Sequence, residues 1–482
     1  MKFEVMNKAS IEKNLLKLKG KADELLHRSF DQQVNVAVTG LSRSGKTAFI
    51  TSLVNQLISE NHQSELAFFS PIAQQRFIAA KRVPQQHNLV PRFTYDEGID
   101  SLSHTPPSWP EPTKTISELR LAVRYQPNNS LLKLATDVVT MYIDFTDYPG
   151  EWLLDLPMLN QTYEEWSEQT MSLLTKEPRL SAASGFIDEV NALDPFAPMD
   201  EQKLAELATQ YTDLLHTFRN ELGLSVIQPG RFILPGDLAG APILQFFPFT
   251  RFDAIDKNDY QNADNETVIG TLRARFTEYK ANVVKKFYKK YFVNFDRQIV
   301  LCDSLTALNH GKASFDDLQL AISMILESFD YGKSSLLKRL FSPKIDKLLF
   351  AATKADHVTP DQHGNLVKLL NKMVYKKRHE LHYQSVDVKT LALASVRTTA
   401  VGKSKYQNKD INVLKGKRAD DDKVITVFPG SVPSEIPNQE HWQNNQYNFI
   451  EFAPYTPLQE HQALPHIRMD QALEFLLGDK MR

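Results

Sequence analysis

The sequence has very little cysteine and no long apolar stretch. Cys302 is the only cysteine among 482 residues, which excludes a disulfide within the chain and is typical of a reducing compartment. No apolar run approaches the roughly 20 residues that a membrane-spanning helix requires. The N-terminus, which includes Lys2 and Glu4, lacks the apolar segment of a secretory signal. We therefore expect a soluble, cytoplasmic protein.

The chain also lacks a strong charge of either sign. It carries 56 Lys and Arg residues against 58 Asp and Glu residues, a formal net charge of -2. A protein with so small a net charge has no global attraction to nucleic acid or acidic lipid, so any such contact must come from a local basic patch. At 482 residues the chain is long enough for roughly two to three domains, or for one domain with a large insertion.

What the sequence does contain is a phosphate loop at Gly40–Thr47, with the sequence G-L-S-R-S-G-K-T. Apolar alternation predicts a strand over 34–38 before it, and helical periodicity predicts a helix over 46–57 after it. In this context, successive backbone N–H groups point at phosphate oxygens and the helix presents its positive N-terminus to them. The predicted nucleotide-binding residues of the loop are Ser42, Arg43, Ser44, Gly45, Lys46, Thr47 and Ala48.

Three residues of this loop have specific predicted roles. Lys46 would bridge the β- and γ-phosphates, and the Thr47 hydroxyl would ligate Mg²⁺. Arg43 lies close to the expected γ-phosphate, so it could add positive charge during hydrolysis, as an arginine finger does. A salt bridge or a solvent-facing side chain fits the position of Arg43 equally well, and both interpretations stay open.

A second motif, D-x-x-G, follows the strand predicted at Met141–Phe145. In this motif Asp147 would hold Mg²⁺, usually through water, and the Gly150 N–H would meet the γ-phosphate. Ligands of open α/β sheets bind at the carboxyl ends of strands, which is where this motif lies. Asp144 is the competing metal carboxylate, but it lies within the strand, so we expect it to brace the sheet or a switch instead.

A third motif, T-K-x-D at Thr353–Asp356, ends another apolar strand. The Asp356 carboxylate would accept hydrogen bonds from both N1–H and N2–H of guanine, a pair of donors that adenine lacks. The Lys354 stem would lie along the base, and backbone N–H groups of Ser395 and Val396, after the next strand, would face guanine O6. Threonine in place of the more common asparagine is expected to weaken bracing of the phosphate loop more than base selection.

Three further residues complete the candidate catalytic set. Glu151 directly follows D-x-x-G, where many GTPases carry a glutamine that orients the attacking water. Its carboxylate would repel phosphate unless a cation intervenes, so we expect slow intrinsic hydrolysis. Thr113 and Thr115 are the candidates for the switch threonine that completes Mg²⁺ coordination when the γ-phosphate is present. The sequence does not choose between these two threonines.

The order of predicted elements is that of an α/β protein. Residues 119–125 and 138–145 predict a β-hairpin between the first two motifs, which suits GTPases, whereas most ATPase cores would place a helix there. Residues 60–117 are polar with few periodic apolar positions, so we interpret them as a long connection and a candidate switch region. We predict a P-loop GTPase-type, mostly parallel sheet with one antiparallel edge hairpin and a mainly helical inserted domain.

The predicted domain boundaries follow from these patterns. They are an N-terminal amphipathic helix over 1–30, a GTPase core over 31–151 and 297–400, a mainly helical insertion over 152–296, and a C-terminal extension packed on the core over 401–482. The extension contains a charged segment over 415–423, a predicted short strand over 424–428 and a predicted final helix over 469–477.

The remaining candidates are weaker. Lysines interleave with aromatic and aliphatic residues in the predicted helix 267–291, a pattern compatible with a membrane surface or nucleic acid but more often a core face opposite solvated lysines. We predict no specific nucleic-acid partner, and we take the insertion as the contact for a protein effector or a membrane-associated partner. His379 and His382 lack the additional ligands of a structural metal site, and Cys302 is interpreted as a core residue.

Four motifs together resemble the bacterial YcjX-like family of stress-associated P-loop GTPases over nearly the whole chain. They are the phosphate loop, Asp147–Trp152 (D-Y-P-G-E-W), the tryptophan-proline segment Ser108–Thr113, and Ala352–Asp356 (A-T-K-A-D). The second and third are the more particular to the family. The resemblance implies a cytoplasmic GTP-binding protein linked to stress responses. It places Gly45, Lys46 and Thr47 on phosphate and metal, and Lys354 and Asp356 on guanine.

Three functions are compatible with these motifs. The leading hypothesis is a regulatory switch that binds GTP and hydrolyses it slowly, with Mg²⁺, to GDP and phosphate. The second is a module that retains GTP or GDP as a structural ligand with negligible hydrolysis. The third is an ATPase or kinase, which the predicted hairpin and the T-K-x-D motif both disfavour.

Overall fold

The computed structural model describes residues 32–41, 44–59, 65–129, 133, 136–329, 345–383, 386–421, 423–454 and 462–482. The helix predicted within 1–30 lies outside the described residues, as do Ser42 and Arg43 of the phosphate loop. The same holds for the side chains of His379 and His382. The predictions that concern these residues therefore stay predictions.

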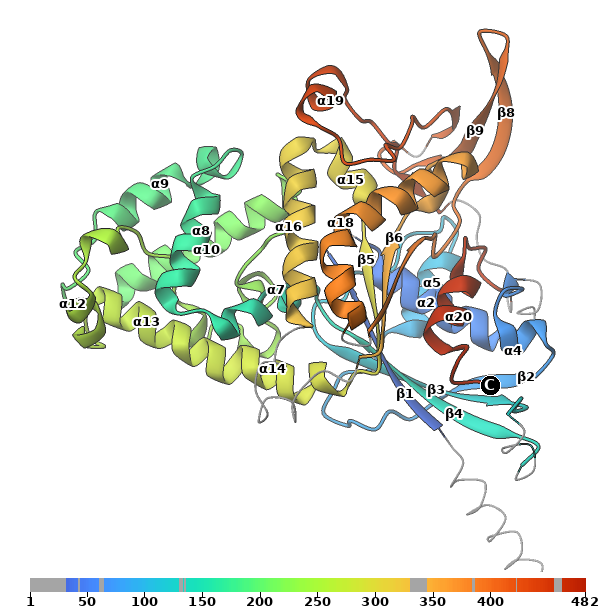
Figure 1. The fold of residues 1–482 in the computed structure, drawn as a ribbon, viewed down its shortest axis with the longest axis horizontal. Coiled ribbons are helices and arrows are strands. Elements are labelled where there is room, and N and C mark those ends of the chain that lie inside the picture. Colours follow the sequence, from blue (N-terminus) through green and yellow to red (C-terminus); the bar gives the residue numbers. More distant parts are fainter. Residues whose placement is uncertain are drawn as a thin grey trace, which may run out of the picture.

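A mixed sheet of seven strands forms the centre of the molecule (Figure 1), with the strand order β2-β3-β4-β1-β5-β6-β7. Strands β1, β4, β5, β6 and β7 run parallel, whereas β3 runs antiparallel to both of its neighbours. The fold class is therefore α/β with a mostly parallel sheet, as the sequence predicts. The strands are β1 Gln32–Gly40, β2 Phe77–Val83, β3 Ser117–Tyr125, β4 Val139–Asp147, β5 Arg297–Cys302, β6 Lys347–Ala352 and β7 Asp387–Ala392.

The parallel strands bring their carboxyl ends to one edge of the sheet. Val38 of β1 pairs with Asp147 at the end of β4, and Gly40 pairs with Leu301 near the end of β5. Cys302 in turn pairs with Ala352 at the end of β6. The phosphate loop, D-x-x-G and T-K-x-D follow these strand ends directly. The register of the sheet therefore gathers the three motifs at a single edge.

The connection 60–117 is more ordered than the sequence predicts. Its described part contains α4 (Ser70–Ala73), the strand β2 and α5 (Tyr95–Ser103). The predicted hairpin β3–β4 is present, but β2 pairs with the outer side of β3, so that the hairpin is not at the edge of the sheet. The sequence pattern missed β2 because no side chain in it is fully buried. Without one buried face, the strand shows no apolar alternation.

Two hydrophobic clusters cover the two faces of the sheet. One face packs against α2 (Lys46–Ile58) and α20 (Met469–Leu477). The other packs against α16 (Lys312–Ser328) and α18 (His363–Tyr383), and its cluster continues into the helical segment 152–296, which lies to one side of the sheet in Figure 1. One face of the sheet and the core of the helical segment therefore share a single apolar interior.

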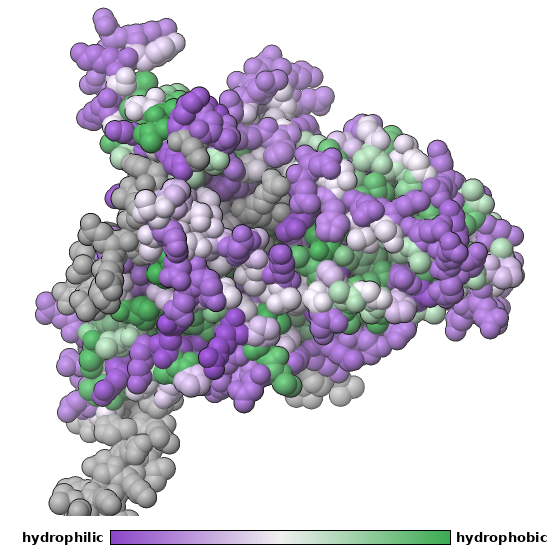
Figure 2. Space-filling model, turned by 180° about the vertical axis from the view of Figure 1, so that it is seen from behind, coloured by the Kyte–Doolittle hydropathy of each residue, from purple (hydrophilic) through white to green (hydrophobic). Residues whose placement is uncertain are grey.

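The segment 152–296 is mainly helical, as predicted. Its buried aromatic residues include Phe276, Tyr279 and Phe287, while Lys285 and Lys289 on the same helical stretch are exposed. The lysine pattern is thus a core face opposite solvated lysines. In Figure 2 polar residues cover most of the visible face, with smaller apolar areas between them. The helices are α7 Glu151–Leu154, α8 Tyr163–Leu174, α9 Arg179–Asn191, α10 Glu201–Asn220, α11 Gly230–Ile233, α12 Lys257–Asn262, α13 Val268–Tyr279, the π-helical turn η5 Lys280–Val284, and α14 Lys285–Lys290.

The C-terminal part forms a second, smaller sheet that the sequence predicts only in part. The predicted strand at 424–428 and the predicted final helix are present as β10 and α20, but the long β8–β9 hairpin was missed. The hairpin projects away from the body of the molecule (Figure 1), and many of its side chains are exposed. Residues 415–418 of the charged segment belong to β9. The elements here are β8 Ala400–Tyr406, β9 Lys409–Arg418, β10 Val424–Val427, α19 Gln439–Asn444 and β11 Phe452–Ala453.

Two findings complete the description of the fold. Helix α15 (Ser304–Asn309) follows β5 and leads into α16. Among the helices that the structure describes, none is long and apolar enough to span a bilayer.

A buried ion pair ties the helical segment to the core. Asp317 of α16 contacts Arg179 of α9, with 2.7 Å between Oδ1 and Nη2, and both side chains are largely buried. The second carboxylate oxygen of Asp317 accepts hydrogen bonds from the backbone N–H groups of Ser225 and Val226, each at 2.7 Å. The carboxylate therefore holds α9 and the chain at 225–226 against α16.

We expect Asp317→Asn to lower the free energy of unfolding by about 3 kcal/mol, because the change leaves a buried guanidinium without its counter-charge. The matched control is Asp316→Asn, which removes the partner of Lys312 in an exposed pair on the next residue of the same helix. That change should cost less than about 0.5 kcal/mol. Urea unfolding of both variants measures the difference, and equal effects would contradict the role assigned to Asp317.

Candidate functional site

A cavity of about 340 Å³ lies at the carboxyl edge of the parallel strands. The phosphate loop and the start of α2 form one end of it, and the T-K-x-D segment with the chain at 394–396 forms the other. Segment 109–113, the start of α7, the end of α10 and the second sheet supply the remaining walls. The phosphate loop and the T-K-x-D segment therefore line one cavity, and Glu151, directly after D-x-x-G, lines it with them.

Lys46, which lines the phosphate-loop end of the cavity, forms an ion pair with Asp147, which is not among the lining residues. The Lys46 ammonium lies 3.6 Å from Asp147 Oδ1 and donates a hydrogen bond to the carbonyl oxygen of Tyr148 at 3.2 Å. Asp147 is 1% exposed, and neither of its carboxylate oxygens has a hydrogen-bond donor among the described residues. A buried carboxylate without donors is costly unless a cation compensates it. This is the property expected of a ligand-binding or metal-binding carboxylate.

Thr47 and Thr113 contribute hydroxyl oxygen atoms to the cavity. Their hydroxyl oxygens lie 3.3 Å apart, and both residues line the cavity. Thr115 is not among the lining residues. Hydroxyl and carboxylate oxygens, completed by water and phosphate, are the ligands that Mg²⁺ prefers. Among the described residues no group of three or more His, Cys, Asp or Glu side chains could hold a metal, so a cation here would depend on this mixed set.

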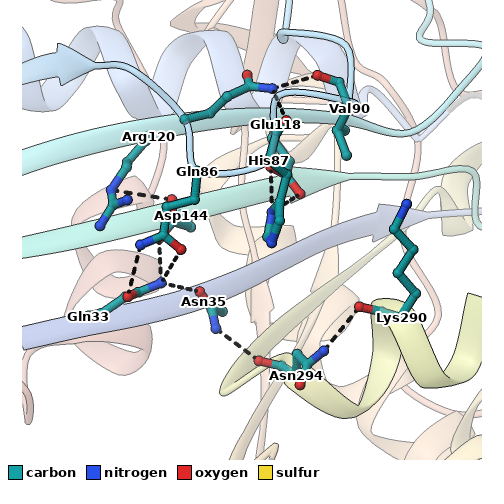
Figure 3. A network of polar contacts seen from close by, with 11 residues as sticks. Gln33, Asn35, Gln86, His87, Val90, Glu118, Arg120, Asp144, Lys290 and Asn294 are labelled. Atoms are coloured by element: carbon teal, nitrogen blue, oxygen red, sulfur yellow. Dashed lines mark hydrogen bonds and ion pairs between the residues drawn. The ribbon is translucent and has the colours of Figure 1, made fainter.

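Asp144 lies away from the cavity, on a polar face of β4 (Figure 3). Gln33 of β1 donates a hydrogen bond to it at 2.9 Å, and the guanidinium of Arg120 on β3 lies 3.6 Å from it. Burial raises the pKa of Asp144 from its ordinary value, and attraction to Arg120 partly opposes that rise. The position agrees with the bracing role predicted for this residue rather than with metal binding.

The other end of the cavity, formed by the T-K-x-D segment, contains Asp356, which is 4% exposed. Its Oδ2 accepts hydrogen bonds from the backbone N–H of Thr398 at 2.8 Å and from the Thr398 hydroxyl at 2.7 Å. These two bonds fix the orientation of the carboxylate. Ser395 and Val396 line the cavity nearby. Their backbone N–H groups have no acceptor in the part of the chain that the structure describes, whereas that of Ala394 donates to Ile467.

Lys354 is held by two carboxylates. Its ammonium lies 2.6 Å from Asp303, at the end of β5, and 2.6 Å from Glu451 of the C-terminal segment. Burial lowers the pKa of Lys354, but attraction to Asp303 and Glu451 outweighs burial and raises the pKa above its ordinary value. The lysine is therefore charged, and its stem is fixed along the wall of the cavity. Phe452, the neighbour of Glu451, also lines the cavity and packs edge-on against His357.

Glu151 has a partner that the sequence did not indicate. Its side chain is 4% exposed and forms an ion pair with Arg219 of α10, with 3.1 Å between Oε1 and Nη2. Both residues line the cavity together with Lys46. The helical segment thus supplies the cation that a carboxylate at this position requires. Arg43, the arginine of the phosphate loop for which the sequence left two interpretations open, lies outside the described residues.

Comparison with known proteins agrees with the motifs. A model of the YcjX-like family, DUF463, matches residues 34–481. The chain belongs to the YcjX-like family. It is 48% identical over 467 residues to the protein named Ras-like GTPase YcjX of Escherichia coli (strain K12), covering 97% of this chain and 100% of that protein. It is 42% identical over 487 residues to a protein of the same name from Shewanella oneidensis, covering 98% and 99% of the two chains.

The YcjX-like motif D-Y-P-G-E-W is embedded in the helical segment. A Cβ atom on Gly150 would lie 2.3 Å from the carbonyl oxygen of Gly40, so the backbone after β4 packs directly on the phosphate loop. A Cβ atom on Gly230 would lie 2.3 Å from the carbonyl oxygen of Glu151. The indole N–H of Trp152 donates to the carbonyl oxygen of Leu234 at 3.3 Å. Any movement of this motif must therefore move or break its contacts with the insertion.

Sequence reasoning missed the wall residues that come from the insertion and from the C-terminal segment. Arg219 is the last charged residue of an amphipathic helix, and Glu451 and Phe452 follow a polar stretch without periodicity. None of the three belongs to a motif of fixed spacing. No local pattern signals them, because the contacts span 68 residues between Glu151 and Arg219 and 97 residues between Lys354 and Glu451. Tertiary packing alone brings them to the cavity.

Asp155 lies in the same embedded segment. It accepts hydrogen bonds from the Tyr279 hydroxyl at 2.5 Å and from the Gly230 N–H at 2.9 Å. Burial raises the pKa of Asp155 from 3.8 to about 7, and these hydrogen bonds and the charge of Arg231 only partly oppose the rise. The folded protein therefore retains a proton on Asp155 between roughly pH 4 and pH 7, in a range where the unfolded chain has released it.

We expect this proton to make the free energy of unfolding fall as the pH rises toward 7, because the native state then binds more protons than the unfolded state. Asp155→Asn should remove about 2 kcal/mol of that fall between pH 5 and pH 7. Urea unfolding at a series of pH values measures it. Asp237→Asn, a change at the exposed partner of Arg231, should leave the slope unchanged. Equal slopes of the free energy of unfolding against pH for wild type and Asp155→Asn would refute the raised pKa of Asp155.

Proposed function

We propose that this protein binds GTP and hydrolyses it slowly, with Mg²⁺, to GDP and phosphate, and that it acts as a nucleotide-dependent switch. The observation that carries this proposal is that Lys46 and Asp356 line one cavity and that Lys46 pairs with the buried Asp147, so that the three motifs follow the order typical of GTPases. The two relatives described above bear the name Ras-like GTPase. Their similarity to this chain over nearly its full length supports the same chemistry here.

The phosphate end favours a triphosphate with Mg²⁺. Lys46 would bind the β- and γ-phosphates, and Thr47 and Asp147 would hold the ion, which when bound offsets the charge of the phosphate oxygens. The contact between the hydroxyls of Thr47 and Thr113 favours Thr113 over Thr115 as the switch threonine. The buried oxygens of Asp147, which lack hydrogen-bond donors among the described residues, fit this role.

The base end favours guanine. Thr398 fixes Asp356, whose carboxylate would accept from N1–H and N2–H of the base, and the backbone N–H groups of Ser395 and Val396 in the cavity wall would donate to O6. Adenine lacks the N1–H and N2–H pair that this carboxylate would accept beside its bonds from Thr398, which disfavours the ATPase alternative. Lys354, fixed by Asp303 and Glu451, provides the stem that would cover the base.

The regulatory part of the proposal rests on three supports. Glu151 in place of a glutamine favours slow hydrolysis, and its ion pair with Arg219 is the specific observation that keeps the second candidate, a module that retains GTP or GDP without turnover. The embedding of Trp152 in the insertion favours contact of that segment with a protein effector. The link to a stress response and the cytoplasmic location derive from the family resemblance. Turnover no faster than that of free GTP would establish the module instead of the switch.

The guanine assignment is tested by Asp356→Asn. We expect guanine nucleotide affinity to fall by about 100-fold or more and xanthine nucleotide affinity to rise, because the amide can donate to the O2 of xanthine but cannot accept both guanine donors. Titration calorimetry with GDP, XDP and ADP measures the three affinities. The control is Asp361→Asn, the same substitution at an exposed aspartate of the same region. Indifference of GDP binding to Asp356→Asn would refute the guanine assignment.

The switch threonine is tested by Thr113→Ala against Thr115→Ala. We expect Thr113→Ala to weaken the binding of a non-hydrolysable GTP analogue by about 10-fold in Mg²⁺, with GDP affinity almost unchanged, because this hydroxyl is expected to contact the ion only when the γ-phosphate is present. Thr115→Ala should leave both affinities unchanged. The opposite pattern, a loss with Thr115→Ala alone, would show that Thr113 had been assigned wrongly.

A further inference from the structure

Helix α10 brings an arginine of the insertion to the phosphate end of the cavity. Arg219 lies close to the C-terminal end of the helix, at the cavity wall that also contains Lys46 and Glu151. Its side chain is 24% exposed, whereas that of Glu151 is 4% exposed. The guanidinium is therefore accessible from the cavity, while its carboxylate partner is buried in the wall.

The neighbours of Glu151 fix where this guanidinium lies relative to a bound nucleotide. Gly150, one residue before Glu151, packs against the backbone of Gly40 at the start of the phosphate loop. The carboxylate of Glu151 is thus carried by the segment that lies against the expected γ-phosphate. The Arg219 guanidinium lies 3.1 Å from that carboxylate. A rotation of its side chain would therefore bring it to the expected position of the γ-phosphate.

The charges at this end of the cavity make a change of partner favourable. The cations Lys46 and Arg219 oppose the anions Asp147 and Glu151. Binding of a nucleoside triphosphate adds negative charge beside the buried carboxylate of Glu151, and like charges in a poorly solvated site repel strongly. A guanidinium has the planar set of donors that can bind carboxylate and phosphate oxygens together.

We propose that Arg219 extends from Glu151 to the γ-phosphate of bound GTP and stabilises the charge that develops during hydrolysis, so that the insertion supplies a catalytic residue in cis. The inference rests on the proposed GTPase function and names a residue outside the three motifs. In the step concerned, a water oxygen bonds to the γ-phosphorus and the bond from that phosphorus to the β–γ bridging oxygen breaks. GDP leaves with the electron pair, and the proton of the water passes to the phosphate product.

The same contact would make the insertion sensitive to the nucleotide. With GTP bound, Arg219 would link α10 to the γ-phosphate; with GDP bound, it would keep its ion pair with Glu151. Because Gly230 and Leu234 of the insertion contact Glu151 and Trp152 directly, the change of partner occurs within a packed interface. Loss of the γ-phosphate would then change the conformation of the insertion, including its outer surface.

The experiment is single-turnover GTP hydrolysis by the full chain with Arg219→Ala, Glu151→Gln and the double variant. We expect Arg219→Ala to slow hydrolysis by about 100-fold or more, as loss of an arginine finger does in other systems. Its affinity for GDP should change by less than about threefold, because GDP lacks the phosphate concerned. Arg219→Lys keeps the positive charge but lacks the planar set of donors of a guanidinium, so its hydrolysis should still be about 10-fold slower than that of wild type. This variant tests the proposal if the alanine variant is unstable.

The double variant separates phosphate contact from simple neutralisation of Glu151. If Arg219 binds the γ-phosphate, Arg219→Ala with Glu151→Gln stays slow; if Arg219 only compensates the carboxylate, the double variant recovers the rate of Glu151→Gln, and the proposal is overturned. Unchanged hydrolysis by Arg219→Ala would also overturn it. A wild-type protein that binds GTP without hydrolysing it would refute the proposed GTPase function together with this inference, so the two failures are distinguishable.

The matched control is a second arginine–glutamate pair of the insertion. Arg275 on α13 lies 2.7 Å from Glu201 at the other end of α10, and neither residue lines the cavity. Arg275→Ala and Glu201→Gln should leave both hydrolysis and GDP affinity at wild-type values. Equal slowing by Arg275→Ala and Arg219→Ala would show a general effect of the insertion on the core and would overturn the specific role of Arg219.

Discussion

The parallel pairing of β1 with β4 on one side and with β5 on the other is the constraint on which the rest of the site depends. Parallel strands end at the same edge of a sheet, and a right-handed helical crossover is needed between them. The chain therefore emerges from β1, β4, β5 and β6 in one place. The phosphate loop, Asp147, Asp303 and Lys354 each occupy one of these exits, and charged groups distant in sequence become neighbours.

The insertion is part of this site rather than an appendage. Its core is continuous with the apolar face of the sheet that α16 and α18 cover, and a buried pair between Arg179 and Asp317 joins the two by polar contacts. The segment that follows D-x-x-G runs directly into it. A shift of Gly150 toward or away from a phosphate would thus meet the resistance of a packed interior, which transmits displacement rather than absorbing it.

The C-terminal sheet contributes at the opposite end of the cavity. Glu451 completes the pair of carboxylates around Lys354, and Phe452 adds an apolar wall beside His357. A solvent-exposed lysine loses rotamer freedom when it packs on a bound base. A lysine already held by two carboxylates has lost that freedom before the base binds. In the proposed function, the second sheet would support base recognition by holding Lys354 in place, although it lies outside all three motifs.

The sequence by itself determined the α/β class, the strands that carry the motifs and the helical character of residues 152–296, because apolar periodicity and glycine-containing loops are local signals. It failed at β2 and at the β8–β9 hairpin, where exposed side chains leave no apolar alternation. Only the tertiary structure paired Arg219 with Glu151 and Glu451 with Lys354, and only it placed Thr113 beside Thr47. These contacts join residues far apart in the chain, and no local propensity encodes which distant side chain will balance a buried charge.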